Sequence, residues 1–106
     1  MNHRIEQLLE FIETEPNEPF NRYALALEYI NFDINLAQKH FEILKKQQPD
    51  YLPLYYHLGK LYEEKENYSM ALEIYKQGIE LARMQNNSKT EKELSNALNN
   101  CVLENM

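Results

Sequence analysis

Apolar positions recur at helical spacing along the chain. Near the N-terminus Ile5, Leu8, Leu9 and Ile12 fall on one side of a helix with 3.6 residues per turn. Similar patterns follow in later segments, separated by prolines, asparagines and short polar turns. The pattern predicts an all-α protein of about six helices with short connections, which is typical of antiparallel helical hairpins.

Polar residues ahead of the apolar runs predict where helices begin. Asp33 or Asn35 is expected to cap the third helix, and Asp50 the fourth, which has Pro53 in its first turn. Asn67 marks the turn before the fifth helix.

The break between the fifth and sixth helices has its own signals. Asn86 and Asn87 are expected to end the fifth helix in a left-handed conformation. Ser88 and Glu91 have the spacing of a capping box for the sixth.

The chain also repeats itself with a period of 33 to 34 residues, which is typical of helical repeat proteins. Shifting it by 33 residues superimposes these pairs: Pro16 on Pro49, Tyr23 on Tyr56, Leu25 on Leu58, Ala26 on Gly59 and Tyr29 on Tyr62. Shifting it by 34 residues places Ala37 on Ala71 and Phe41 on Tyr75. The repeated unit is a helical hairpin.

The second copy closely resembles the tetratricopeptide repeat, whose pattern is an aromatic, a Leu-Gly pair, a tyrosine and then a small-aromatic-small trio. The residues that carry the resemblance are Tyr55, Leu58, Gly59, Tyr62, Ala71, Tyr75 and Gly78. The first copy fits less fully, with Leu25, Ala26, Tyr29, Ala37, Phe41 and Pro49.

Three positions depart from the repeat pattern. Arg22 stands where an aromatic or large apolar residue is usual, and Leu44 where a small one is. The second copy has Arg83 in place of the closing proline, which lets its second helix continue.

The resemblance implies a single domain over residues 1–106, folded as a short right-handed solenoid of antiparallel hairpins. Its expected parts are an N-terminal capping helix at 3–15, repeat 1 at 19–51, repeat 2 at 52–85 and a C-terminal capping helix at 88–104. Both flanking helices would cover apolar faces that the hairpins leave open.

The resemblance also assigns packing roles. Leu58 and Gly59 are expected where the helices of a hairpin cross, and Gly59 would let the neighbouring backbone approach. Tyr55 and Tyr62 belong on the same packed side.

Tyr56 and Lys60, four residues apart, lie on another stripe of that helix. The resemblance implies that this stripe lines a concave surface that binds a peptide or protein, and Tyr23 and Leu27 match it one repeat earlier. The candidate partner-binding residues are Tyr23, Leu27, Tyr56, His57 and Lys60, with Glu63 and Glu64 at the margins. The alternative for Tyr23 and Tyr56 is ordinary packing against the first and third helices.

Charge and hydropathy limit the classes of partner. A formal net charge of -6 in 106 residues would repel a nucleic-acid backbone. No apolar run is long enough to cross a bilayer, and the first residues lack the features of a signal peptide, so we expect no membrane partner and a cytoplasmic location. The lone Cys101 is expected to be a packed small side chain.

Catalytic and metal chemistry find little support. His57 beside Lys60 has no nucleophile or carboxylate placed to complete a catalytic unit. His3, His40 and His57 do not have metal-ligand spacing, so no metal, cofactor or enzymatic activity is expected.

One known subfunction of the family can be tested on the residues. Members that clamp the C-terminal carboxylate of chaperones use a lysine and two asparagines, and the matching positions hold Tyr23, Leu27 and His57. We therefore expect no such clamp and no chaperone tail as the partner. The leading hypothesis is therefore a binding module with an adaptor or assembly role and another protein or peptide as its partner. The alternative is a structural domain that associates with itself as a homodimer.

Overall fold

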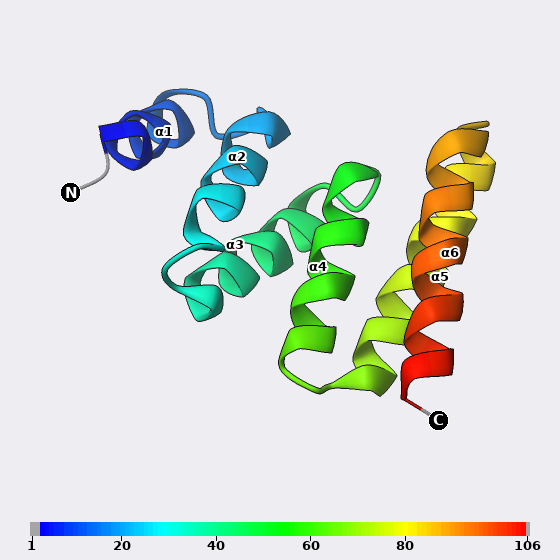
Figure 1. Cartoon of the computed structure of the whole chain (residues 1–106). Coiled ribbons are helices and arrows are strands. Elements are labelled where there is room, and N and C mark those ends of the chain that lie inside the picture. Colours follow the sequence, from blue (N-terminus) through cyan, green and yellow to red (C-terminus); the bar gives the residue numbers. More distant parts are fainter. Residues whose placement is uncertain (1–2, 106) are drawn as a thin grey trace. The chain divides into compact units, whose positions relative to one another are not determined.

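The structure is a computed structural model that describes residues 3–105, and this part of the chain is built from α-helices without strands (Figure 1). The six helices are α1 (His3–Thr14), α2 (Pro19–Tyr29), α3 (Ile34–Gln47), α4 (Pro53–Glu64), α5 (Tyr68–Met84) and α6 (Ser88–Glu104). The all-α prediction is confirmed. The longer second helix of the second copy agrees with Arg83 standing where a proline would close it.

The helices form two compact units, one ending at Tyr51 and the other beginning at Leu52. Unit 1 contains α1, α2 and α3, and unit 2 contains α4, α5 and α6. The expectation of a single domain concerns how the two units are placed, and it stays a prediction.

In unit 1, α2 packs against both α1 and α3. The core between α1 and α2 contains Ile5, Leu8, Ala24 and Leu25, with Ile12 packed at its edge. Leu9 shares the apolar side of the predicted helix with Ile5, Leu8 and Ile12, but 42% of its surface is exposed. Leu8 takes the buried position, and a single-residue step of about 100° turns Leu9 to solvent.

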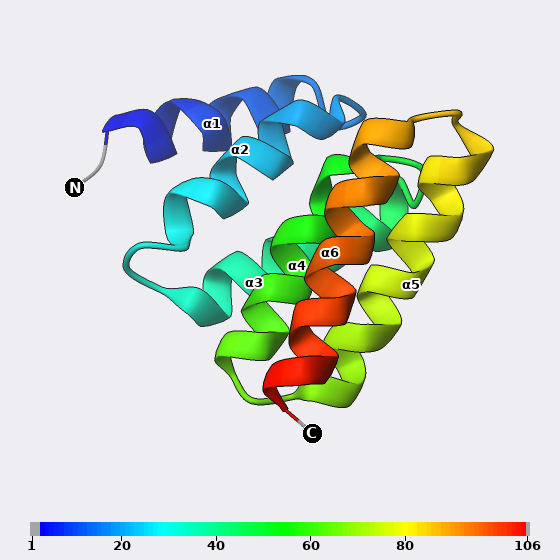
Figure 2. The same cartoon turned by 45° about the vertical axis from the view of Figure 1, so that its right-hand side comes forward.

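In unit 2, α5 packs along both α4 and α6, and α4 and α6 contact each other much less. Figure 2 shows the three helices of this unit side by side, with α6 in front. The largest fully buried side chains of this unit are Tyr75, Leu54, Leu58, Leu94 and Cys101. The expected burial of Tyr55, Tyr62 and Cys101 is confirmed.

At the two glycines of unit 2, a side chain from a neighbouring helix occupies the space that a Cβ would need. A Cβ added to Gly59 would lie 2.7 Å from Cδ1 and from Cζ of Tyr75. A Cβ added to Gly78 would lie 2.8 Å from Cβ of Tyr55 and 2.9 Å from Cδ1 of Leu94. Gly59 was expected to let a backbone approach, and this is corrected: the space it leaves is filled by an aromatic ring.

Two predicted helix caps are wrong. The residue that precedes α4 is Leu52 rather than Asp50, and it makes no side-chain cap bond, while Pro53 pre-sets the first turn. Asn87 rather than Ser88 caps α6, since its Oδ1 accepts from the backbone N–H of Thr90 at 3.0 Å. Ser88 is already the first helical residue.

Other caps and turns agree with the sequence. Asp33 caps α3 by accepting from the N–H of Leu36 at 3.2 Å, and Asn67 caps α5. Asn86 has a φ of 57°, as expected for a left-handed end. Glu66 also has a positive φ, of 60°, which the sequence did not indicate because glutamate has no special preference for that region.

Candidate functional site

The five predicted partner-binding residues divide between the two units. Tyr23 and Leu27 lie on α2 of unit 1, whereas Tyr56, His57 and Lys60 lie on α4 of unit 2. Their union into one binding surface depends on the placement of the units, so it stays a prediction. Within each unit, the contacts of these residues are defined.

In unit 1, Tyr23 is half-buried in a cluster of aromatic rings. Its ring centroid lies 5.4 Å from that of Tyr51, 6.2 Å from that of Phe41 and 6.4 Å from that of Phe20. Burial raises the pKa of its hydroxyl. Tyr23 therefore packs against Phe41 of α3, and both Tyr23 and Leu27 remain partly accessible. The most exposed aromatic ring of α2 is that of Phe20.

The departure at Arg22 has a structural reason. Its Nη1 donates to Nδ1 of His40 on α3 at 2.9 Å. The imidazole of His40 also stacks on the ring of Tyr29, with centroids 5.5 Å apart and planes 17° apart. Burial, together with the positive charges of Arg22 and Lys39, lowers the pKa of His40 to about 4. A polar link therefore joins α2 to α3 where the repeat pattern usually has an apolar contact.

In unit 2, Tyr56 presents an exposed ring, with 39% of its surface accessible. The Nζ of Lys60 lies 5.6 Å from the centroid of that ring, which is within the range of a cation–π contact. His57 meets the same ring edge-on with centroids 5.5 Å apart, and burial lowers the pKa of its imidazole. His57 therefore favours its neutral form more than a free histidine does, and Lys60 is the fixed positive charge of this stripe.

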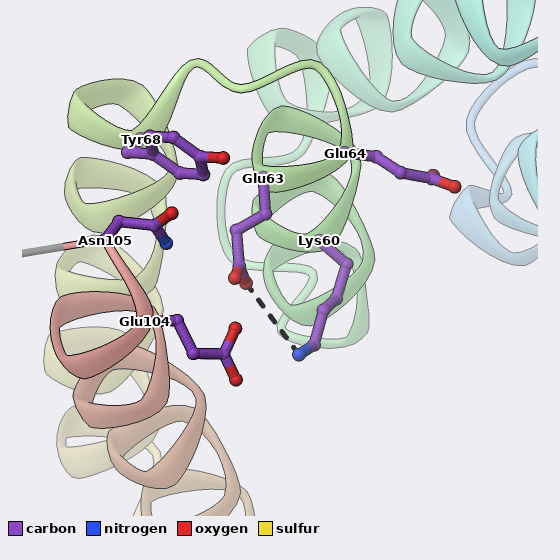
Figure 3. A pocket seen from close by; sticks show the side chains of 6 residues that line it. All are labelled: Lys60, Glu63, Glu64, Tyr68, Glu104 and Asn105. Carbon is purple, nitrogen blue, oxygen red and sulfur yellow. Dashed lines mark ion pairs between the residues drawn. The ribbon is translucent and has the colours of Figure 1, made fainter.

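Beside this stripe, a pocket of about 460 Å³ opens between the C-terminal ends of α4 and α6, with the start of α5 at its side (Figure 3). It is lined by Lys60, Glu63, Glu64, Tyr68, Glu104 and Asn105. The sequence indicated the residues from α4. It missed Tyr68, Glu104 and Asn105, because their proximity depends on α5 and α6 packing back on α4.

A register argument could have found Glu104. Cys101 occupies in α6 the place that Tyr62 has in α4, and Glu104 follows Cys101 at the spacing by which Lys65 follows Tyr62. A third helix packed in the same direction as α4 therefore brings Glu104 level with the end of α4.

Glu63 is the most enclosed carboxylate of the pocket, with 15% of its side chain exposed. Its Oε2 accepts a hydrogen bond from the hydroxyl of Tyr75 and lies 3.7 Å from Nζ of Lys60. Burial and the bond to Glu63 raise the pKa of Tyr75. Burial, followed by the negative charge of Glu63, also raises the pKa of the Cys101 thiol. Glu63 thus links α4 to α5 and acts electrostatically on α6.

Residues 3–105 contain neither a cluster of metal-binding side chains nor a helix suited to cross a membrane. No group of three or more histidine, cysteine, aspartate or glutamate side chains within that range is arranged to hold a metal ion. None of the helices described there is both long and apolar enough to span a membrane.

Solved structures provide the comparison with known proteins. A solution structure of a tetratricopeptide repeat domain protein from Salinibacter ruber is 43% identical in sequence, with a TM-score of 0.78. The match covers 82% of this chain and 89% of that one. A crystal structure described in the same terms, from the same organism, is 42% identical over 79% of this chain and 96% of that one, with a TM-score of 0.76.

A third structure supports the fold alone. A solution structure of a protein from Bordetella parapertussis has a TM-score of 0.83 at 20% identity, over 98% of this chain and 91% of that one. Comparison with protein-family models and with curated proteins gives no match.

Proposed function

Because the chain belongs to the tetratricopeptide repeat family, whose fold generally serves protein interaction rather than catalysis, we propose that it binds a peptide or protein surface through the first helices of its repeats. We further propose that it is a cytoplasmic adaptor or assembly factor without enzymatic activity. The binding residues in this proposal are Tyr56 and Lys60 on α4, and Tyr23 and Leu27 at the matching positions of α2.

The observation that carries the proposal is the exposed pair of Tyr56 and Lys60. An aromatic ring with 39% of its surface accessible offers apolar area to a partner and loses little conformational entropy on binding. Lys60, whose side chain is 44% exposed, places a charge beside that ring. The neighbouring Leu58, Gly59 and Tyr62 are all buried and serve packing, so this pair is what the middle of α4 offers to a partner.

Co-purification from cells that express the protein tests the proposal. We expect the Tyr23→Ala, Tyr56→Ala double variant to lose at least one partner that the wild-type chain retains, as quantified by mass spectrometry. Phe32→Ala is the matched control, because Phe32 is 59% exposed and outside the proposed surface. A folded double variant that keeps every partner would refute the site assignment.

Self-association as a homodimer is the second candidate. It is favoured by Val102 and Leu103 on the last helix, which are 40% and 71% exposed. Light scattering over a range of concentrations separates the two candidates. A mass that rises toward the dimer in the wild-type chain and falls with Leu103→Ser would support self-association, and a monomer throughout would exclude it.

A further inference from the structure

The charge and size of the pocket between α4 and α6 indicate the kind of group that it could bind. We infer that it receives the side chain of an arginine or lysine from a basic partner peptide, and that Lys60 occupies the cation position until the peptide binds. The inference rests on the proposed function, since it names the chemistry of the partner. It changes the role of one residue in that proposal: the cation of the partner replaces Lys60, so Lys60 is not itself a contact to the partner. It uses contacts within unit 2 only.

Charge is the first argument. Three glutamates and one lysine line the pocket: Glu63, Glu64, Glu104 and Lys60. Helices α4 and α6 end at Glu64 and Glu104, so the negative ends of both helix dipoles add to the carboxylates. A cationic group is therefore complementary to this pocket, whereas an acidic peptide would be repelled.

Lys60 already places a cation in this pocket. Its ammonium lies 3.7 Å from Oε2 of Glu63 and 5.6 Å from the ring centroid of Tyr56. A cation held between a carboxylate and an aromatic face is the arrangement that a bound lysine or arginine would adopt. Lys60 thus shows where the charge of a ligand would lie.

Third, the two members of this ion pair differ in how firmly they are held. Glu63 is 15% exposed and is fixed by the hydroxyl of Tyr75, whereas Lys60 is 44% exposed on a flexible stem. An ion pair with one such exposed partner contributes only about 0.2–1 kcal/mol, so exchanging Lys60 for another cation costs little. The acceptor is preorganised, and the donor is replaceable.

The size and the remaining lining also suit one long side chain. A volume of about 460 Å³ lies in the range of small-ligand sites and is too small for a folded surface. Tyr68 gives an aromatic wall for the stem or for a guanidinium plane. The Nδ2 of Asn105 donates to the carbonyl oxygen of Cys101 at 2.9 Å, which leaves its Oδ1 as an additional acceptor.

The test is an NMR titration of the full chain, labelled with ¹⁵N, against an acetylated and amidated hexa-arginine peptide at physiological salt. The same peptide made of citrulline has nearly the same shape without the charge. We expect saturable shifts at Lys60, Tyr68 and Glu104 with the arginine peptide and none with the citrulline peptide. Shifts that are equal for both peptides, or that avoid the pocket, would overturn the inference.

Substitution of Lys60 gives a sharper result. Lys60→Met removes the internal cation, and we expect it to tighten binding of the arginine peptide by about three- to fivefold, the equivalent of one surface ion pair. Lys76→Met is the matched control, because it makes the same charge change at an exposed position of α5 outside this pocket. Two results would contradict the inference. An equal gain in affinity in both variants would show that only the net charge matters. Weaker binding by Lys60→Met would show that Lys60 is itself a contact.

The carboxylates are tested in the opposite direction. We expect Glu104→Gln to weaken binding by about three- to fivefold and Glu80→Gln, an exposed control on α5, to weaken it by less than half as much. If a partner is captured through Tyr23 and Tyr56 while hexa-arginine leaves the pocket unchanged, the inference fails and the proposed function stands.

Discussion

The ring of Tyr75 in α5 fills the space that Gly59 in α4 leaves open, and both residues are buried. Because a Cβ at position 59 would lie 2.7 Å from two atoms of this ring, helix and ring accommodate one another only while the glycine is present. The glycine loses about 1 kcal/mol of helix propensity relative to alanine, and the close packing of α4 on α5 outweighs it.

The first prediction follows from this contact. Gly59→Ala is expected to lower the free energy of unfolding by about 1–3 kcal/mol in urea unfolding. The added methyl group forces the buried ring to move, and the cost of that overpacking exceeds the gain in helix propensity. Gln77→Ala, at an exposed position of α5, should change stability by less than about 0.5 kcal/mol. In a Tyr75→Leu background the cost of Gly59→Ala should shrink, since the ring is gone. A Gly59→Ala variant more stable than the wild type would contradict the packing role.

A second prediction concerns the bond between Tyr75 and Glu63. Tyr75→Phe keeps the ring but removes the donor to a largely enclosed carboxylate, so we expect a loss of about 1–2 kcal/mol in the free energy of unfolding. Tyr68→Phe is the control, because that tyrosine is only partly buried. Equal stability of the Tyr75→Phe variant and the wild type would show that the hydroxyl contributes nothing.

The third prediction is a pH dependence due to His40. Its pKa lies at about 4 in the folded protein against an ordinary value of 6.5, so the folded state binds the proton less readily than the unfolded chain. The contribution of neutral His40 to the free energy of unfolding is complete above pH 6.5 and is lost as the pH falls from 6.5 toward 4. His40→Asn retains an acceptor for Arg22 but does not titrate. Its melting temperature should therefore fall less between pH 7 and pH 4.5 than that of the wild type.

His57 remains in both proteins of that comparison, and burial lowers its pKa in the same direction. The difference between the two melting curves therefore reports His40 alone. Parallel pH profiles of the wild type and His40→Asn would exclude the proposed pH dependence.

The fourth prediction separates two adjacent residues at the start of α6. Asn87→Ala removes the bond to the N–H of Thr90 and should cost about 1 kcal/mol. Ser88→Ala changes a residue already inside the helix and should be near neutral, because alanine is the better helix former there. Urea unfolding of the two variants decides which one is the cap, and a reversed order would restore the capping box.

The positions of the six helices were predictable because periodicity and turn residues are local signals. The repeat pattern also identified the buried Leu58 and Tyr75. Single residues at helix ends were harder: Asp50 and Ser88 have cap chemistry, but neither directly precedes its helix. Propensity alone does not distinguish a cap from its neighbour.

The candidate site was predictable only in part. Helical spacing separated the exposed Tyr56 and Lys60 from their buried neighbours, because spacing decides which residues share a face. Glu104 and Asn105 come from a helix distant in sequence, so the spacing within α4 does not indicate them. Only the comparison of α6 with α4 in the repeat register places Glu104 near the end of α4. The contact of Tyr23 with Phe41 agrees with the alternative of packing against the third helix. The contact with Tyr51 was not indicated, because Tyr51 lies beyond the end of α3 and is distant from Tyr23 in sequence.

The bond between Tyr75 and Glu63 means that the residues of the pocket differ in how freely they can change during evolution. A substitution at Glu63 disturbs the packing of α4 on α5, so selection for stability restrains this residue whatever the partner. Lys60, Glu64 and Glu104 are exposed and can change with little loss of stability. Descendants of this chain could therefore acquire new partners by altering the rim of the pocket while its anchoring carboxylate and the fold stay the same.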